Sequence, residues 1–495
     1  MKKIGKYVLG VDIGTGSAKT ILSGFPGQAA SIFTVSYSTR HPQPGYAELD
    51  PEEVAKAVFH CIQQVVDTQY TAPAVISFSS AMHSLMAVDN LGNPLTPLML
   101  WSDHRSKNEA ADIKESVAGS EIYQRTGTPI HAMSPMSKIK WLQNHQPQTF
   151  QKAHKFIGIK EYIFHKLFKQ FVVDYNIASA MGMFDFRELT WYNQALAAAG
   201  ISADQLSLPV NPATAFTQAD SILVADMGIH NDTVFVIGGS DGCMAQIGSG
   251  ATKEHTATLT IGTSGAIRMV SNTPKVSANG ELFTYVLTDN KYLIGGAINN
   301  GGGAINWFRE TFYPASSKSE LSTQIDAAFA IQPGAGGLLC LPYFAGERAP
   351  IWNSDARGVF LGIGVEHTVA HFNRALVEGI SYSLYNVGEA LHQTTGRIDN
   401  VLVSGGFTAS QDWIQLLSDV FQLPMVLQAE LDSSAIGASL LAWQHLGEVD
   451  AWHYEAHDFL AEYRPTQQPA YAKQYALFKE AYQQLKGIFP KLQPH

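Results

Sequence analysis

Hydrophobic residues form two similar segments that lie about half a chain apart, and each segment is interrupted by glycine and hydroxyl residues. In residues 8–22 the interruption is Gly-Thr-Gly-Ser, and in residues 257–270 it is Gly-Thr-Ser-Gly. Apolar and β-branched residues favour strands, and glycine accepts the backbone angles of tight turns. Each segment therefore predicts a strand, a glycine-rich turn and a second strand. Their recurrence indicates a duplicated architecture.

The same patterning predicts alternating strands and helices in the rest of the chain. Asp50 and Pro51 begin a helix that runs to about Asp67, because an N-cap aspartate, a proline at N1 and an acid at N3 favour helix initiation. Residues 110–194 follow a mainly helical pattern, and a last helical stretch covers 471–488. Strands are predicted at 31–37, 75–78, 85–89, 234–237, 292–294 and 401–403. This succession predicts an α/β fold, in which sites often lie where strands end.

The length of the chain indicates two domains. With 495 residues, of which 45% are hydrophobic and 15% charged, the chain is too long for one core. We predict a first domain over 1–245 and a second over 246–495. The boundary then falls just after the glycine-rich turn that follows the strand at 234–237.

Charge and cysteine content restrict the partners and the compartment. The net charge is -10, from 33 basic and 43 acidic residues, and no lysine and arginine cluster with interleaved aromatics occurs. This argues against nucleic acid and anionic membrane, and favours a small-molecule partner. The three cysteines are widely spaced, so neither a disulfide framework nor a zinc site is indicated. Without a recognisable signal peptide or long apolar run, we expect a soluble cytoplasmic protein.

The two glycine-rich turns suit phosphate oxygens, although an ordinary hairpin is the alternative for either turn alone. Glycine exposes backbone N–H groups there, and the threonine and serine hydroxyls add donors. A carboxylate occurs only in the first copy, where Asp12 corresponds to Thr260 of the second. Asp12 is well placed to hold Mg²⁺ through water, because Mg²⁺ keeps several waters and takes few carboxylates. The P-loop pattern is absent, and Lys19 is either a solvated side chain or a phosphate contact.

A candidate catalytic acid stands at the end of another predicted strand. Asp241 lies in a turn with three glycines, which leave room for a substrate. A kinase of small alcohols needs a carboxylate to accept the hydroxyl proton as the phosphoryl group arrives. Asp241 is therefore our candidate base, with a helix cap as the alternative role. Glycine turns at 295–303 and 404–410 either accommodate a nucleotide or allow close helix packing.

Two longer motifs occur in order along the chain. One covers residues 133–144, and the other covers 358–363 followed by 371–378. The Asp-Ile-Gly-Thr of the first turn precedes both, and Asp241 lies between them. In these motifs, over nearly its whole length, the chain resembles the FGGY carbohydrate kinases. The resemblance implies a two-domain actin-like ATPase fold of the ribonuclease H-like type, with a duplicated βββαβα core and an interdomain cleft.

The resemblance also implies roles for single residues. Asp241 matches the catalytic base of the family, and Asp241 and Asp12 match its metal side, so ATP and Mg²⁺ are the expected cofactors. The residues that match ATP-binding positions are Gly14, Thr15, Gly16, Ser17, Lys19, Gly262, Thr263, Gly302, Asn306, Gly405, Gly406 and Ser410. Three departures are visible, since glycerol kinases carry threonine, glutamine and asparagine where this chain has Gly16, Gly242 and Ser410.

The expected acceptor is a sugar acid. Glycerol kinases carry Arg-Glu where this chain has Met82 and His83, whereas Met-His resembles xylulose kinases and gluconate kinases. Residues 77–85, 125–131 and 159–164 are most similar to the gluconate kinase branch. This implies transfer of the ATP γ-phosphoryl group to the terminal hydroxyl of D-gluconate, giving 6-phosphogluconate. A bound carboxylate needs a cation or several N–H donors. The substrate-binding candidates are Met82, His83, His131, Lys138, Lys160, Asp241 and Arg348.

Other functions remain open at this point. A xylulose-type pentulose kinase would use the same residues on a neutral ketose. An actin-like, ATP-driven switch protein would need an appended partner-binding domain, and none is evident after the helical stretch at 471–488. A non-catalytic sugar sensor is disfavoured by the intact Asp12 and Asp241. The sequence leaves a homodimer open, because one chain does not reveal which apolar surface is exposed.

Overall fold

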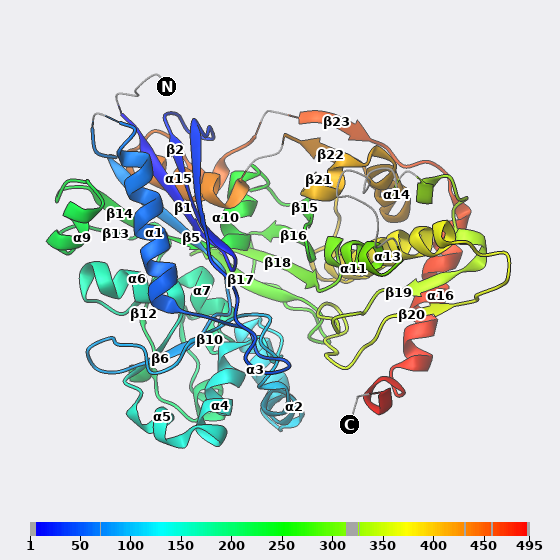
Figure 1. Cartoon of the computed structure of the whole chain (residues 1–495), viewed down its shortest axis with the longest axis horizontal. Helices are drawn as coiled ribbons and strands as arrows, with labels where there is room; N and C mark the ends of the chain where they lie inside the picture. Colours follow the sequence, from blue (N-terminus) through cyan, green and yellow to red (C-terminus); the bar gives the residue numbers. More distant parts are fainter. Residues whose placement is uncertain are drawn as a thin grey trace.

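Two mixed β-sheets form the two lobes of the molecule (Figure 1). The computed structural model describes residues 6–69, 71–312, 325, 327–429, 432–456 and 459–492. The sheet of the first lobe has the order β13-β14-β5-β1-β2-β3, formed by Ala215–Phe216, Val234–Ser240, Val75–Ser80, Val8–Ile13, Ser17–Ser23 and Ser31–Ser36. The sheet of the second lobe has the order β17-β18-β16-β15-β21-β22-β23, formed by Phe283–Thr288, Lys291–Ile298, Gly265–Ser271, Thr256–Ile261, Asn400–Ser404, Met425–Gln428 and Phe459–Tyr463.

The two sheets repeat one arrangement, which confirms the duplication expected from the recurring turn. β1 pairs antiparallel with β2 and parallel with β5, and β15 pairs in the same way with β16 and β21. β2 continues antiparallel to β3, as β16 does to β18. β5 continues parallel to β14, as β21 does to β22. Because β1, β5 and β14 are parallel, their carboxyl ends lie at one edge of the first sheet.

Helices cover the faces of both sheets. α1 (Pro51–Val66) packs against β2 and β3, and α13 (Val369–Thr395) packs against β16 and β18. The predicted N-cap of α1 is confirmed, since the Asp50 carboxylate accepts a hydrogen bond of 3.0 Å from the backbone N–H of Glu52. The other α-helices whose bounds lie in the described residues are α2 (Lys107–Glu115), α3 (Gly119–Thr126), α4 (Pro135–His145), α5 (Pro147–Lys152), α6 (Ile159–Phe168), α7 (Tyr175–Ala180), α8 (Asn193–Ala199), α9 (Ser221–Asp226), α10 (Asp241–Gly248), α11 (Gly302–Phe312), α14 (Gln411–Phe421), α15 (Ser433–His445) and α16 (Pro469–Leu485).

The mainly helical region predicted at 110–194 forms the lower part of the first lobe in Figure 1. It also contains short strands, which the sequence did not predict. The short strands outside the two large sheets are β4 (Glu48–Leu49), β6 (Met86–Val88), β7 (Leu98–Met99), β8 (Lys155–Ile157), β9 (Val172–Asp174), β10 (Phe184–Asp185), β11 (Thr190–Trp191), β12 (Leu208–Val210), β19 (Leu339–Leu341) and β20 (Val359–Leu361).

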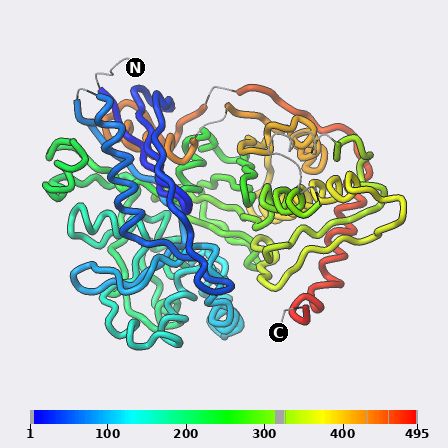
Figure 2. The backbone as a smooth tube through the Cα atoms, in the orientation of Figure 1, coloured from blue at the N-terminus to red at the C-terminus, as the bar shows by residue number. Residues whose placement is uncertain are grey.

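The two lobes interlock through α15. This helix comes from the second half of the chain, yet it packs on β1 and β5 of the first sheet and on α10, as the orange segment beside the blue strands shows (Figure 2). The approach needs glycine: a Cβ atom on Gly437 would lie 1.9 Å from the carbonyl oxygen of Met244. Residues 434–439 of α15 therefore pack closely against α10. The division at 245/246 falls within α10 and stays a prediction.

One predicted strand end is wrong. β18 does not end at Ile294 but continues to Ile298. Gly295 allows this continuation, because a Cβ atom there would lie 2.3 Å from the carbonyl oxygen of Ile267 on the neighbouring strand β16. Glycine serves close strand packing at this position, and the turn before α11 begins only after Ile298.

The three cysteines are buried and free, in agreement with the predicted absence of a disulfide framework. No helix in the part of the chain that the structure describes is long and apolar enough to cross a membrane.

Candidate active site

A cavity of about 300 Å³ lies where the two glycine-rich turns meet. Thr15 of the first turn and Thr263 of the second both line it, together with Asp241. Predicted acceptor residues Met82, His83 and Arg348 line the same cavity. Residues from distant parts of the sequence and from both lobes therefore surround one space.

Asp241 is placed by the end of β14 and the first turn of α10. Ser240 caps this helix, and its hydroxyl accepts a hydrogen bond of 3.3 Å from the N–H of Cys243. Gly238, with φ of +68°, lets β14 approach β5, since a Cβ atom there would lie 1.7 Å from the carbonyl oxygen of Phe78. Burial raises the pKa of Asp241, and the positive charge of Arg268 acts in the opposite direction. The carboxylate therefore starts a helix and also faces the cavity.

Asp12 lies near the end of β1, opposite Ser79 of β5 in the sheet register. The Ser79 hydroxyl donates a hydrogen bond of 2.7 Å to the Asp12 carboxylate. Burial raises the pKa of Asp12 to about 6, and the charge of Asp241 adds to this rise. Two carboxylates thus lie close enough to disfavour each other's charged form, an environment that a cation would stabilise.

His83 is a neutral hydrogen-bond acceptor in the cavity. Its backbone is left-handed, with φ of 65°, and its Nδ1 lies 2.8 Å from the carbonyl oxygen of Ala180. A carbonyl only accepts, so Nδ1 carries the proton and Nε2 keeps a lone pair. Nε2 lies 3.3 Å from the hydroxyl of Tyr285. Burial lowers the pKa of His83 to about 3, so the ring is uncharged at neutral pH. Its Nε2 therefore accepts a hydrogen bond from the Tyr285 hydroxyl.

Lys138 does not line the cavity but supports it from behind. The side chain has no exposed surface, and its Nζ donates hydrogen bonds of 2.7 Å to the carbonyl of His83 and 2.6 Å to the carbonyl of Leu100. Trp101, which follows Leu100, lines the cavity. Lys138 therefore ties two cavity-lining segments together through their backbone.

Lys160 supports the base in a similar way. It forms an ion pair of 2.7 Å with Asp174, and its Nζ donates a hydrogen bond of 2.7 Å to the carbonyl of Gly239. Gly239 lies two residues before Asp241. Both lysines predicted to contact substrate thus have partners within the protein, and neither lines the cavity.

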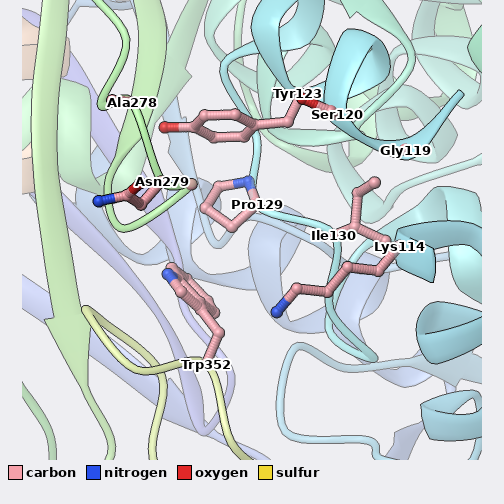
Figure 3. Close-up of a pocket in the computed structure, with 10 residues that line it drawn as sticks. Lys114, Gly119, Ser120, Tyr123, Pro129, Ile130, Ala278, Asn279 and Trp352 are labelled. Carbon is pink, nitrogen blue, oxygen red and sulfur yellow. The ribbon is translucent and has the colours of Figure 1, made fainter. Parts of the chain in front are cut away.

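His131 belongs to a neighbouring outer cleft. Its Nε2 lies 3.0 Å from the Ser354 hydroxyl, and its ring centroid lies 5.5 Å from that of Trp352. His131 and Trp352 line a cavity of about 510 Å³ in this cleft. An adjoining pocket of about 270 Å³ is lined by Lys114, Tyr123 and Asn279 together with Trp352 (Figure 3). Because Trp352 also lines the inner cavity, its indole separates the two spaces.

The predicted nucleotide residues form two groups. At the second turn, the N–H of Gly302 donates a hydrogen bond of 2.7 Å to the carbonyl of Gly262, and Gly303 does the same to Thr263 at 3.0 Å. Gly405 lies beside Ile261, the last residue before this turn. These glycines and Thr263 therefore meet in one place, while Gly14, Thr15, Gly16 and Ser17 form the first turn.

Four other predicted nucleotide residues have local partners or face outward. Lys19 forms an ion pair of 2.7 Å with Asp432, just before α15. The Ser410 hydroxyl caps α14 and accepts a hydrogen bond of 3.3 Å from the N–H of Trp413. Asn306 is exposed on α11, about one turn after Gly302, and Gly406 is exposed in the turn after β21.

Several cavity residues were not predicted, among them Trp101, Arg268 and Tyr285. Arg268 had a visible signal, because a charged residue interrupts the apolar run of β16. Trp101 and Tyr285 had none, since aromatic residues in apolar segments are usually part of the core.

Comparisons with known proteins agree with this architecture. The sequence profile described as the FGGY family of carbohydrate kinases, N-terminal domain, matches residues 7–248, and the C-terminal domain profile matches 257–444. The chain belongs to the FGGY family of carbohydrate kinases.

The chain is 41% identical over 481 residues to a protein from Bacillus subtilis named gluconokinase, covering 95% of this chain and 93% of that relative. A solved gluconate kinase from Lactobacillus acidophilus superposes with a TM-score of 0.93 at 33% identity, covering 99% of this chain and all of that one. A ligand-bound xylulose kinase from the same species gives 0.93 at 32%, with 99% and 100% coverage. The expected actin-like ATPase fold is confirmed.

Proposed function

We propose that this protein is an ATP-dependent kinase that transfers the γ-phosphoryl group to the terminal hydroxyl of D-gluconate, giving 6-phosphogluconate. The observation that carries the proposal is the cavity in which Asp241 faces two arginines and the two glycine-rich turns. The relative named gluconokinase, at 41% identity over nearly the full chain, supports the choice of acceptor.

In the proposed mechanism Asp241 accepts the proton of the acceptor hydroxyl as the phosphoryl group arrives. A general base of this kind works best when its pKa lies closer to the operating pH than that of an ordinary carboxyl. Burial moves the pKa of Asp241 in this direction. The Tyr285 hydroxyl, which donates to the neutral Nε2 of His83 at 3.3 Å, can accept a hydrogen bond from another hydroxyl of the sugar acid, and Met82 supplies an apolar wall.

The first and second glycine-rich turns are proposed to hold the phosphates of ATP. Thr15 and Thr263 contribute hydroxyls to the cavity, and the turns offer backbone N–H groups. The nucleotide then lies between the lobes 1–245 and 246–495, and closure over it would exclude water from the reaction.

Asp12 and Asp241 are the residues proposed to hold Mg²⁺. In the described ranges no group of three or more His, Cys, Asp or Glu residues could hold a metal ion. Two carboxylates suit Mg²⁺ nevertheless, because this ion takes few protein ligands and completes its shell with water and phosphate oxygens. When bound, the ion would neutralise charge on the transferring phosphate.

The test is a coupled assay of ATP consumption with Mg²⁺ over D-gluconate, D-xylulose, L-ribulose, glycerol and no sugar. We expect gluconate to have the highest kcat/KM, and Asp241→Asn to lower kcat by roughly 10² to 10⁴ with ATP binding retained. The exposed Asp226→Asn is the matched control. Near-normal turnover by Asp241→Asn would contradict the assigned base, and preference for a ketose would contradict the assigned acceptor.

A xylulose-type kinase is the second candidate. The similarity to the ligand-bound xylulose kinase, with the same TM-score as the gluconate kinase, favours it. A neutral ketose, however, would leave the two arginines of the cavity without an anionic partner on the acceptor. The D-xylulose arm of the assay separates the two candidates.

A further inference from the structure

We propose that Arg268 binds the carboxylate of the acceptor and thereby selects a sugar acid over a neutral polyol or ketose. The inference rests on the proposed function, and it concerns a residue that the motifs of the family do not include.

The guanidinium of Arg268 lines the cavity with free donors. Arg268 lies on β16 opposite Gly295, between the buried Ile267 and Met269. Among the described residues its side chain forms no hydrogen bond and no ion pair, although a guanidinium carries five N–H donors. Asp241 is close enough to influence its charge but is not paired with it. Donors held at a cavity wall without a protein acceptor suit an acceptor group on a ligand.

Arg348, the other arginine of the cavity, is already engaged. Its Nε donates a hydrogen bond of 2.7 Å to the Asn299 side chain, and its Nη2 donates one of 3.1 Å to the carbonyl of Ile298. The guanidinium also stacks on Trp101, with 4.6 Å from Cζ to the ring centroid. Arg348 therefore forms a fixed wall, whereas Arg268 keeps a complete set of donors for a bidentate contact.

Gly242 provides the space that Arg268 occupies. A Cβ atom at this position would lie 3.5 Å from Nε of Arg268 and 3.2 Å from the terminal methyl of Met82. An added Cβ would touch both side chains, so a side chain longer than that of alanine would crowd them. Glycine at 242 therefore leaves room for the guanidinium of Arg268 at the cavity wall.

The charges of the cavity wall also favour an anionic acceptor. Its ionised side chains are one carboxylate, Asp241, and two guanidinium groups, Arg268 and Arg348. His83 is neutral, and burial raises the pKa of Tyr285, so neither adds charge. Glu347 lies behind the wall, where its carboxylate accepts a hydrogen bond of 2.9 Å from the backbone N–H of Arg348. A carboxylate on the acceptor would balance the excess positive charge, and charge-assisted bidentate pairing is strong in such an environment.

The test compares D-gluconate with D-gluconamide, which has the same shape and the same terminal hydroxyl but no charge. We expect the wild type to prefer gluconate in kcat/KM by about 10²-fold, in line with charged hydrogen bonds. Arg268→Met should lower kcat/KM for gluconate by a similar factor and leave the gluconamide value within about threefold. Arg268→Lys should retain part of the preference, because an ammonium binds a carboxylate without the bidentate geometry. The exposed Arg397→Gln is the control for loss of one positive charge.

Equal losses of kcat/KM for gluconate and for gluconamide in Arg268→Met would overturn the proposal. They would mean that Arg268 acts on Asp241 or on the fold. A preference for gluconate that survives in Arg268→Met but disappears in Arg348→Gln would also overturn it. Isothermal titration calorimetry with gluconate in the absence of ATP measures acceptor binding directly. We expect Arg268→Lys to bind gluconate more weakly than the wild type does, and this variant keeps the test available if Arg268→Met folds poorly. If the wild type phosphorylates D-xylulose and not gluconate, the proposed function itself is overturned. If the wild type uses gluconate and gluconamide equally, only the role proposed for Arg268 is overturned.

Discussion

Replacement of Lys138 by methionine is expected to weaken both the fold and acceptor binding. Lys138 is buried on α4, and its Nζ donates to the carbonyls of His83 and Leu100. Methionine has a similar length and no donors, so the substitution removes these contacts without leaving a large cavity. The change therefore tests whether a lysine outside the cavity controls its shape.

The magnitude follows from what each carbonyl loses. The Leu100 carbonyl also accepts a hydrogen bond of 3.1 Å from the N–H of Asp103, so it keeps a partner. The His83 carbonyl has no second donor among the described residues. One orphaned buried carbonyl costs about 1–3 kcal/mol of the free energy of unfolding. His83 is also held in a left-handed conformation, which would relax when its carbonyl is released, and we expect KM for gluconate to rise about 10-fold.

The loss of stability should depend on pH. Burial lowers the pKa of Lys138 to about 7, whereas an unfolded lysine titrates at about 10.4. Between these values the unfolded chain binds one more proton than the folded chain, so the wild type gains stability as pH rises. Below about pH 7 both states are protonated, and the fold carries the cost of the buried charge. Methionine does not titrate, so the variant lacks this pH-dependent gain. The loss in free energy of unfolding caused by Lys138→Met should therefore be larger at pH 8.5 than at pH 6.5 by about 2 kcal/mol.

The assay is urea unfolding of the wild type and Lys138→Met at both pH values, together with steady-state kinetics for gluconate and ATP. Lys140→Met is the matched control, because Lys140 lies on the same helix and, among the described residues, its Nζ donates a hydrogen bond only to Gln143. We expect the control to behave as the wild type and KM for ATP to stay constant in both variants. An unchanged KM for gluconate, or equal destabilisation at the two pH values, would refute the reasoning.

Two further predictions concern the packing of the second half of the chain. Arg374→Ala should destabilise the protein by about 3–5 kcal/mol, because it leaves Glu378, now paired at 2.7 Å, buried and without its partner; thermal unfolding against the exposed Arg464→Ala would measure this. Gly437→Ala should cost about 1–3 kcal/mol, since its methyl group would meet the Met244 carbonyl and separate α15 from α10. Gly487→Ala, where nothing lies within 4 Å, should be neutral within about 0.5 kcal/mol, and equal effects of the two glycine changes would contradict the packing argument.

The elements that local chemistry determines could be predicted from the sequence. The two hairpins and the capped start of α1 are examples, because their glycines, caps and apolar runs act on residues close in the sequence. The end of β18 could not be predicted in this way. Gly295 allows a turn as well as a close strand contact, and the choice depends on β16, which lies elsewhere in the sequence.

Two residues of the second long motif, at 371–378, contribute to helix packing. Arg374 and Glu378 form a buried pair in α13, and Arg374 donates a hydrogen bond of 2.7 Å to the Tyr471 hydroxyl of α16. The motif is diagnostic of the family, yet these two residues hold helices together. A motif therefore identifies a family more securely than it identifies a site.

The acceptor site shows most clearly where sequence reasoning ends. Charge is visible in a sequence, so Lys138 and Lys160 were natural candidates for binding a carboxylate. Both lysines donate to backbone carbonyls, those of His83 and Gly239, and Lys160 also pairs with Asp174. Every residue has a carbonyl, and the pairing with Asp174 depends on the fold, so no residue type indicates these contacts. Arg268 differs because its strand neighbours are apolar and its donors meet no acceptor in the described structure. An arginine without a protein partner can be recognised only when the residues around it are known. The assignment of Arg268 to the carboxylate therefore required the fold.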